Sequence, residues 1–214
     1  MQIDIWSDIV CPWCYVGKRR FEQALASFEH RDAVTVRHHA FQLNPAAIPG
    51  ETTTRRASLK SRYNLTDARV DEINAQMATT FSSVGLTFLA GDGLSGNTRA
   101  AHEVVAAAVD ARTQDAVIER LFRAYFTEGR SVFDQASLVE LGAEAGLDAD
   151  ALRTALVDGT YADAVERDLR EARELGITGV PFFVFDGRLA VSGAQMPPMF
   201  EQALAQAWET RKSG

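Results

Sequence analysis

The chain has 214 residues, of which 46% are hydrophobic and 24% charged, with a formal net charge of −7 and a pI near 5.1. This composition is typical of a folded protein with a sizeable core, and the acidic balance without a Lys/Arg-rich run argues against nucleic acid or anionic membrane as the main partner. The sequence shows neither a secretory leader pattern nor a run of about 18 apolar residues, so we expect a cytoplasmic protein with no membrane association.

The N-terminal segment predicts a βαβ unit. Residues 2–9 are typical of an apolar strand, and residues 34–41 alternate in polarity with β-branched side chains, as a second strand does. Between them, Pro12 suits the first turn of a helix, because N–H groups there have no hydrogen-bond partner within the helix and proline lacks that N–H. This helix is expected to run to about residue 29. A right-handed crossover then places the two strands parallel.

The long middle of the chain, residues 44–175, shows helical apolar periodicity and no comparable strand. We therefore expect an all-helical insertion of short, bundled helices. Asn97 and Asp134 stand where N-caps are needed. At this length we expect one domain that carries an insertion.

The C-terminal segment predicts a hairpin and a final helix. Residues 182–185 and 188–192 flank Asp186-Gly187, a two-residue turn whose preference for positive φ suits a type I′ hairpin. Two prolines at 197–198 then begin the last helix. The antiparallel hairpin is expected to complete the sheet.

The motif Cys11-Pro12-Trp13-Cys14 contains the only two cysteines of the chain and lies where the first strand turns into the first helix. Peptide N–H groups and the helix dipole favour an anion there, so we expect the first sulfur to be held as thiolate, the form that attacks disulfides. The second sulfur, that of Cys14 one helical turn later, can form a disulfide with the first. A structural disulfide is a weak alternative, because so small a loop adds little stability to a chain of this size.

Four segments of the chain resemble a known family. They are 8–19 (DIVCPWCYVGKR), 41–45 (FQLNP), 176–183 (GITGVPFF) and 191–195 (VSGAQ). In order and spacing they are similar to DsbA-like thioredoxin-fold oxidoreductases, and within them to the FrnE-like cytoplasmic group.

The resemblance implies an α/β thioredoxin fold with an all-helical insertion. Residues 1–43 and 176–214 would form the thioredoxin-like domain, and residues 44–175 the inserted helical domain. It also implies a cis peptide bond before Pro181, next to the cysteines, where the Val180 backbone can pair with an extended substrate as an added strand.

The chemistry of the pair predicts a mechanism. Cys11, expected to be exposed at the helix start, attacks a substrate disulfide, and Cys14 resolves the mixed disulfide. Pro12 and Trp13 between them tune the thiolate. Trp13 either offers an apolar face to substrate or packs at the helix start. No cofactor is expected beyond the redox-active pair, although glutathione is a possible small thiol substrate.

Other ionisable residues receive plainer interpretations. His38 and His39 point to opposite faces of a strand, and no carboxylate cluster is evident beside them, so we predict no metal. Asp4 and Asp8 lie near Cys11 in the sequence, and one of them could relay protons from Cys14. Asp8 is nevertheless expected to be a solvated aspartate at the strand end, and neither residue is assigned a catalytic part. In the segment 97–103, which resembles a family segment with aspartate at the position of Ala100, His102 is expected to be a half-exposed helix residue.

Three classes of function follow. The first is a thiol-disulfide oxidoreductase acting on a disulfide-containing protein or a small thiol. The second is a glutathione-dependent isomerase or transferase, because 2-hydroxychromene-2-carboxylate isomerases and kappa-class glutathione transferases resemble the same fold, although they carry serine at the position of Cys11. The third is a binding module in which the CxxC motifs of two chains share a zinc or iron-sulfur centre. A homodimer is expected only from the frequency of dimers among proteins.

Overall fold

The computed structural model describes residues 1–89, 91, 93–108 and 111–212. Its strands are β1 (Gln2–Ser7), β2 (Thr35–Ala40), β3 (Thr52–Thr54), β4 (Leu94–Gly96), β5 (Phe182–Phe185) and β6 (Leu189–Ser192). Its α-helices are α1 (Pro12–Ser27), α2 (Arg55–Tyr63), α3 (Asp67–Ser82), α4 (Arg99–Ala107), α5 (Ala111–Arg123), α6 (Gln135–Glu144), α7 (Ala149–Asp158), α8 (Ala162–Glu174) and α9 (Pro197–Lys212). A 3₁₀ turn, η1 (Arg31–Ala33), precedes β2, and a π-helical segment, η2 (Ala124–Glu128), follows α5. No helix in these ranges is long and apolar enough to cross a membrane.

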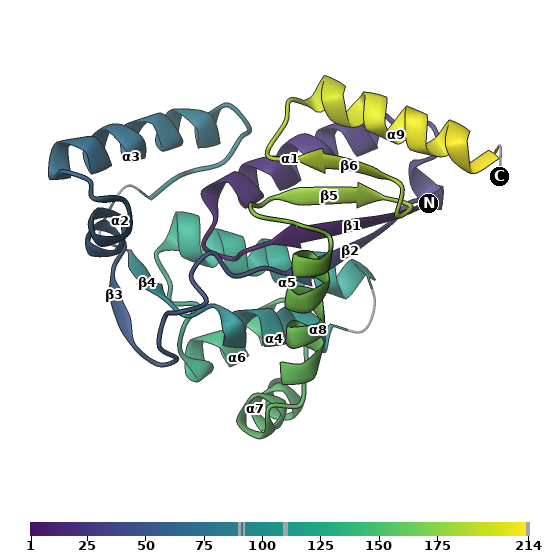
Figure 1. Cartoon of the computed structure of the whole chain (residues 1–214). Coiled ribbons are helices and arrows are strands. Elements are labelled where there is room, and N and C mark those ends of the chain that lie inside the picture. Colours follow the sequence, from purple (N-terminus) through teal and green to yellow (C-terminus); the bar gives the residue numbers. More distant parts are fainter. Residues whose placement is uncertain (90, 92, 109–110, 213–214) are drawn as a thin grey trace.

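A four-stranded mixed sheet with the order β2-β1-β5-β6 forms the centre of the fold (Figure 1). β1 pairs parallel with β2 and antiparallel with β5, and β5 and β6 form an antiparallel hairpin. The predicted βαβ unit and hairpin are therefore confirmed. β1 is shorter than predicted and ends at Ser7, because the chain turns there toward the cysteine motif.

The two faces of the sheet are covered by different helices. On one face Ile3 and Ile5 of β1 pack with Phe21 of α1 and Phe200 of α9 in one apolar cluster. On the other face Trp6 packs against Ala172 of α8. This alternation along β1 is the two-residue period of a strand buried on both sides.

The β5–β6 hairpin differs from the prediction by one residue. Asp186 and Gly187 both have positive φ, 47° and 65°, as a type I′ turn requires. The strands, however, rejoin at the pair Phe185 and Leu189, so Arg188 belongs to a three-residue loop and not to the strand.

The segment between the two halves of the sheet is mainly helical, as predicted, but it is not entirely so. The three-residue strands β3 and β4 form an antiparallel ribbon. They were missed because strands this short carry no usable periodicity. The predicted N-cap at Asp134 is confirmed, since its side chain accepts a hydrogen bond from the Ser137 N–H.

The largest apolar cluster crosses the predicted boundary between the thioredoxin-like part and the insertion. It contains Cys11, Cys14 and Tyr15 together with buried residues from α3 to α7. The Tyr15 ring contacts the rings of Phe81 and Phe122, at centroid distances of 5.8 and 5.0 Å. The division into 1–43 with 176–214 and 44–175 stays a prediction, whereas the core that surrounds the cysteines is shared.

A buried lysine ties α1 to α5. Lys18 is only 5% exposed, and its Nζ pairs with Glu22 on its own helix and lies 3.1 Å from Asp115 and 3.3 Å from Glu119 on α5. A buried cation needs such partners, so these carboxylates fix which surface of α5 faces α1.

A second buried cation ties β2 to β1 and α8. The His39 ring stacks on Trp6 at a centroid distance of 4.4 Å, its Nδ1 lies 2.9 Å from Asp168 Oδ1, and its Nε2 lies 2.9 Å from Asp4 Oδ1. Burial lowers the pKa of His39, but the two carboxylates outweigh it and raise the pKa to about 9. His39 is therefore an imidazolium at neutral pH.

This ion triad predicts a pH window for stability. The folded pKa of His39 lies above the value of about 6.5 expected in the unfolded chain, so its contribution is complete below pH 6.5 and is lost as pH rises through 9. We expect the free energy of unfolding of wild type to exceed that of His39→Gln by roughly 2 to 3 kcal/mol more at pH 6 than at pH 10. Urea unfolding across this range measures the difference, and a difference that is constant with pH would contradict the charged state of His39.

Candidate functional site

The two cysteines occupy the first turn of α1. Cys11 is the N-cap, with extended backbone angles of −87° and 110°, and Pro12 follows in the first helical turn. The Cys14 N–H donates to the Cys11 carbonyl at 3.0 Å. Both cysteines are free thiols, and Cys11 stands at the start of α1, as predicted.

Cys11 is not exposed, contrary to the expectation. Only 3% of the residue is accessible, because the loop before β5 packs over it and its Sγ donates to the Val180 carbonyl at 3.6 Å. The Val180–Pro181 peptide bond is cis, which confirms the geometry implied by the family resemblance. The structure thus brings Cys11, Val180 and Pro181 together.

Gly17 allows this loop to approach α1. A Cβ at that position would lie 2.8 Å from Cγ of Pro181 and 3.4 Å from Ala194. Arg20, one turn later, donates to the Ala194 carbonyl at 2.6 Å and holds the segment after β6 against the same helix. The Gly17 position therefore sets how closely Pro181 lies to α1.

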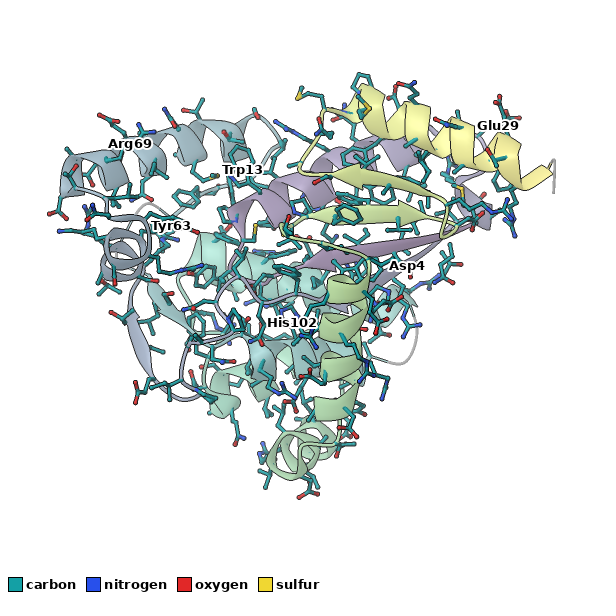
Figure 2. All side chains as sticks on the ribbon, in the orientation of Figure 1. Asp4, Trp13, Glu29, Tyr63, Arg69 and His102 are labelled. Atoms are coloured by element: carbon teal, nitrogen blue, oxygen red, sulfur yellow. The ribbon has the colours of Figure 1, made fainter. Side chains whose placement is uncertain are left out.

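Trp13 extends from the motif toward solvent. Trp13 is 46% exposed, whereas Cys11 and Cys14, which flank the Pro12-Trp13 dipeptide, are buried. Figure 2 shows it at the start of α1, on the side away from His102. This exposure favours the interpretation of Trp13 as an apolar face for substrate over its interpretation as a packing residue.

Cys14 lies behind Cys11 in a buried environment. Burial raises the pKa of its thiol well above the ordinary value, and the neighbouring Cys11 sulfur raises it further. The charge of Asp8 acts in the same direction. Cys14 is therefore a protonated thiol that needs a base before it can act as a nucleophile.

Asp8 is a buried carboxylate, not the solvated one that we expected. The residue is 1% exposed, and its Oδ2 accepts a hydrogen bond from the Leu43 N–H at 2.7 Å. Within the described part of the chain, Oδ1 has no hydrogen-bond partner. Sequence reasoning missed this residue because polar residues at strand ends are usually solvated; the signal was its place inside the apolar run that leads to Cys11.

His102 is also buried, with 2% exposure, although we expected it to be half-exposed. Its Nε2 donates to the Phe41 carbonyl at 2.9 Å and lies 3.5 Å from Oδ1 of Asp8. The reason is that the loop after β2 folds over α4 and covers this face of the helix. Asp8 and His102, 94 residues apart in the sequence, thus form a pair behind Cys14.

Asn97 lies one residue before Thr98, the N-cap of α4, and so not at the N-cap that was predicted for it. Its Oδ1 accepts hydrogen bonds from the Arg99 N–H at the start of α4, at 2.8 Å, and from the Gln42 side chain in the loop after β2, at 3.1 Å. Its Nδ2 donates to the Ala47 carbonyl at 2.6 Å. Asn97 therefore supports the loop that holds Asp8 and His102.

The expectation that no carboxylates accompany the strand histidines was wrong. His38 and His39 do point to opposite faces, but Asp115 lies beside His38, and Asp4, Asp168 and Glu171 surround His39. Ligand atoms of His39, Asp168 and Glu171 lie within 4.8 Å of one another, as in a metal site. Both ring nitrogens of His39 bond to carboxylates, Nδ1 to Asp168 and Nε2 to Asp4, and the expectation of no metal stays a prediction.

Comparison with known proteins places this chain in a family. The model of the DSBA-like thioredoxin domain family matches residues 2–205. The chain belongs to this family. Among curated proteins, YwbO of Bacillus subtilis, described as uncharacterized, is 28% identical over 211 residues, which cover 96% of each chain.

Solved structures agree with the family assignment. A probable DsbA oxidoreductase, SCO1869 from Streptomyces coelicolor, is 42% identical with a TM-score of 0.93, covering 98% of this chain and 90% of that one. A 2-hydroxychromene-2-carboxylate isomerase, 19% identical with a TM-score of 0.71, shares the fold over 100% of this chain and 98% of its own. The cytosolic disulfide reductase DsbM from Pseudomonas aeruginosa, solved with GSH, is 22% identical with a TM-score of 0.61, over 98% and 100% of the two chains. The chain therefore has the DsbA-like thioredoxin fold that was predicted from the sequence.

The contact between α1 and the Pro181 loop gives a first prediction for the site. Gly17→Ala forces its new methyl group against the Pro181 ring, and we expect a loss of roughly 1 to 3 kcal/mol in the free energy of unfolding, measured with urea. Gly91→Ala is the matched control, because a Cβ there meets nothing within 4 Å. Equal stability of the two variants would show that the loop does not rest on α1 as described.

Proposed function

We propose that the protein is a thiol-disulfide oxidoreductase that works through Cys11 and Cys14. Its membership of the DSBA-like family supports this class of reaction. The observation that carries the proposal is the placement of both free thiols in the first turn of α1, beside the cis Val180–Pro181 bond. Cys11 attacks first, because it is the N-cap of α1, where the helix dipole favours an anion, and the exposed Trp13 lies next to it.

The reaction has two thiol exchanges. In the first, the Cys11 thiolate bonds to one substrate sulfur, the substrate S–S bond breaks, and the other substrate sulfur leaves as a thiolate that takes a proton from water. In the second, Cys14 bonds to Cys11, the mixed disulfide breaks, and the second substrate sulfur leaves. The substrate disulfide is reduced by two electrons and the Cys11–Cys14 pair is oxidised.

Asp8 is the base for the second exchange. The Cys14 thiol is buried and protonated, and the carboxylate that affects its pKa is Asp8, whose Oδ1 is free of hydrogen bonds within the described residues. When Cys14 attacks, its proton moves to Asp8 and the carboxylate becomes a carboxylic acid. No net charge is then left in the apolar surroundings of Cys11 and Cys14, where an isolated charge is costly.

An extended substrate fits the loop before β5. Within the described part of the chain, no hydrogen bond uses the Val180 N–H, so a substrate strand can accept it. A cytoplasmic setting, expected from the sequence, would keep the pair largely reduced and favour reduction or isomerisation of disulfides over bulk oxidation.

Equilibration in glutathione redox buffers tests the proposed function. Alkylation counts the free thiols of the two cysteines, and the mass separates the intramolecular Cys11–Cys14 disulfide from glutathione adducts of either residue. We expect a single reversible two-electron transition. We also expect Cys11→Ala to lose insulin-disulfide reduction and Cys14→Ala to accumulate a mixed disulfide on Cys11.

Three results would overturn this function. Full activity in Cys11→Ala would remove the nucleophile from the mechanism. Failure to form an intramolecular disulfide, combined with glutathione-dependent turnover of a small aromatic substrate, would favour the isomerase class. Stoichiometric zinc or iron in the purified protein would favour a shared metal centre.

The role of Asp8 has its own test. Asp8→Asn keeps an acceptor for the Leu43 N–H but removes the base, so we expect resolution of the mixed disulfide by Cys14 to slow by roughly 10²-fold at pH 7. Stopped-flow mixing with DTNB separates the steps: attack by Cys11 releases the first TNB in a second-order phase, and attack by Cys14 releases the second TNB in a first-order phase. Asp4→Asn, on the same strand but bonded to His39, is the control and should leave both phases unchanged. An unaltered second phase in Asp8→Asn would exclude Asp8 as the base.

A further inference from the structure

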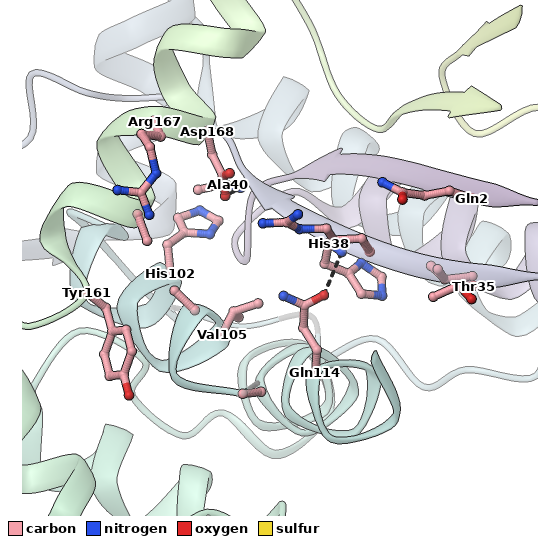
Figure 3. Close-up of a pocket in the computed structure, with 15 residues that line it drawn as sticks. Gln2, Thr35, His38, Ala40, His102, Val105, Gln114, Tyr161, Arg167 and Asp168 are labelled. Carbon is pink, nitrogen blue, oxygen red and sulfur yellow. Dashed lines mark hydrogen bonds between the residues drawn. The ribbon is translucent and has the colours of Figure 1, made fainter. Parts of the chain in front are cut away.

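A cavity runs along β2, the strand at one edge of the four-stranded sheet. It has a volume of about 550 Å³ and is bounded by β2, α4, α5 and α8 (Figure 3). We call it the edge cavity; its lining includes Arg37 and His38 of β2, Val105 of α4, Gln114 of α5 and Arg167 of α8. Its volume lies in the range of small-molecule sites, and neither cysteine lines it, so the reaction described above does not use it.

The outer edge of β2 is already capped by side chains, so the edge cavity does not suit an added strand. The His38 N–H donates to Oε1 of Gln114 at 2.8 Å, and the Ala40 N–H donates to Oδ2 of Asp168 at 2.9 Å. These are the backbone donors that an extended peptide would need in order to pair with an edge strand. The occupant that fits this cavity is therefore a compact small molecule.

The side-chain amide of Gln114 is a buried donor without a partner. Gln114 is 9% exposed, and its Oε1 must face the His38 N–H, which fixes the orientation of the amide. Figure 3 shows the amide nitrogen on the other side, pointing away from His38 and toward Val105. Among the hydrogen bonds of the described residues, none uses this nitrogen. A buried donor without a partner is costly, so Nε2 of Gln114 is a place for an acceptor atom of a ligand.

The charge that is left unpaired at the edge cavity is positive. Asp168, the one carboxylate among the described lining residues, is satisfied, because its Oδ1 accepts from His39 and its Oδ2 from the Ala40 N–H. Arg37 stands beside Asp4 in the pairing of β2 with β1, whereas Arg167 makes no ion pair within the described part of the chain. Both arginines are exposed, so they stand at the mouth of the cavity and attract an anion toward it.

We propose that the edge cavity binds a small organic carboxylate with an apolar body. One carboxylate oxygen accepts a hydrogen bond from Nε2 of Gln114, and the arginines at the mouth balance the charge. The apolar body packs against Val105 and Ala106 of α4 and Ala164 of α8. Such a ligand satisfies both the unpartnered amide and the unpaired guanidinium, which a cation does not. The site goes beyond the proposed redox function and does not depend on it.

Titration with hydrocinnamate, a carboxylate with a phenyl body, tests the site. In nitrogen–proton correlation NMR spectra we expect the side-chain amide signal of Gln114 and the backbone signals of His38 and Val105 to shift until saturation, with a Kd of about 1 mM or tighter. The neutral amide of the same acid should bind at least about tenfold more weakly, because it carries no charge. A response that does not saturate, or that is confined to signals outside the edge cavity, would overturn the proposal.

Two variants test which groups hold the carboxylate. Gln114→Glu keeps an oxygen for the His38 N–H but replaces the Nε2 donor with a second oxygen, so we expect hydrocinnamate to bind at least about tenfold more weakly. Arg167→Gln, at an exposed position where folding is not at risk, should weaken binding roughly three- to tenfold. Arg170→Gln removes the same charge from an exposed position of α8 outside the cavity lining. This matched control should stay within about twofold of wild type, and binding that is equal in wild type and both cavity variants would contradict the site.

The cysteine variants separate this proposal from the redox function. Cys11→Ala removes the proposed nucleophile, yet it should bind hydrocinnamate as wild type does, because Cys11 does not line the edge cavity. Loss of binding in Cys11→Ala would place the probe at the cysteines and overturn the edge cavity as its site. Unchanged binding in a wild-type protein that shows no Cys11–Cys14 transition in glutathione buffers would overturn only the redox function and would support the edge cavity.

Discussion

Helix α1 is buried on several sides, and the two cysteines and the Pro181 loop take their positions from that helix. One side places Phe21 in the core beneath the sheet, another places Cys14 and Tyr15 in the core of the insertion, and Gly17 lets the Pro181 loop lie against the backbone. A helix held by two cores cannot rotate or slide without cavities opening in both. The cysteine geometry therefore depends on the insertion as much as on the thioredoxin-like sheet.

Buried charges mark the joints between the sheet and the insertion. Lys18 meets carboxylates of α5, and His39 lies between Asp4 and Asp168; at a third joint, the buried carboxyl of Asp8 lies 3.5 Å from the ring of His102 on α4. A buried ion pair contributes little net stability, but a buried charge that loses its partner is costly. Each of these contacts therefore disfavours other ways of packing the helices against the sheet. The third joint differs from the other two, because its carboxylate also faces a reactive thiol.

The sequence was sufficient for the elements with strong local signals. The βαβ unit, the hairpin and the cysteine motif at a helix start follow from periodicity, turn residues and Pro12, and the cis bond at Pro181 followed from family resemblance. Burial of Cys11, Asp8 and His102 did not follow, because it arises from loops distant in the sequence that pack over them. The carboxylates around His39 were missed for the same reason, since Asp168 lies on a helix 129 residues away.

The weak hydrogen bond from Cys11 to the Val180 carbonyl links chemistry to substrate affinity. A thiol can donate it, whereas a disulfide sulfur has no hydrogen and cannot. Oxidation therefore frees the carbonyl, and the edge at Val180 then offers both an N–H and a C=O to an incoming strand. The reduced enzyme, in contrast, satisfies part of that edge itself. The backbone that receives the substrate thus changes its capacity for strand pairing with each turnover, and in disulfide reduction that capacity is greater after the electrons have moved than before.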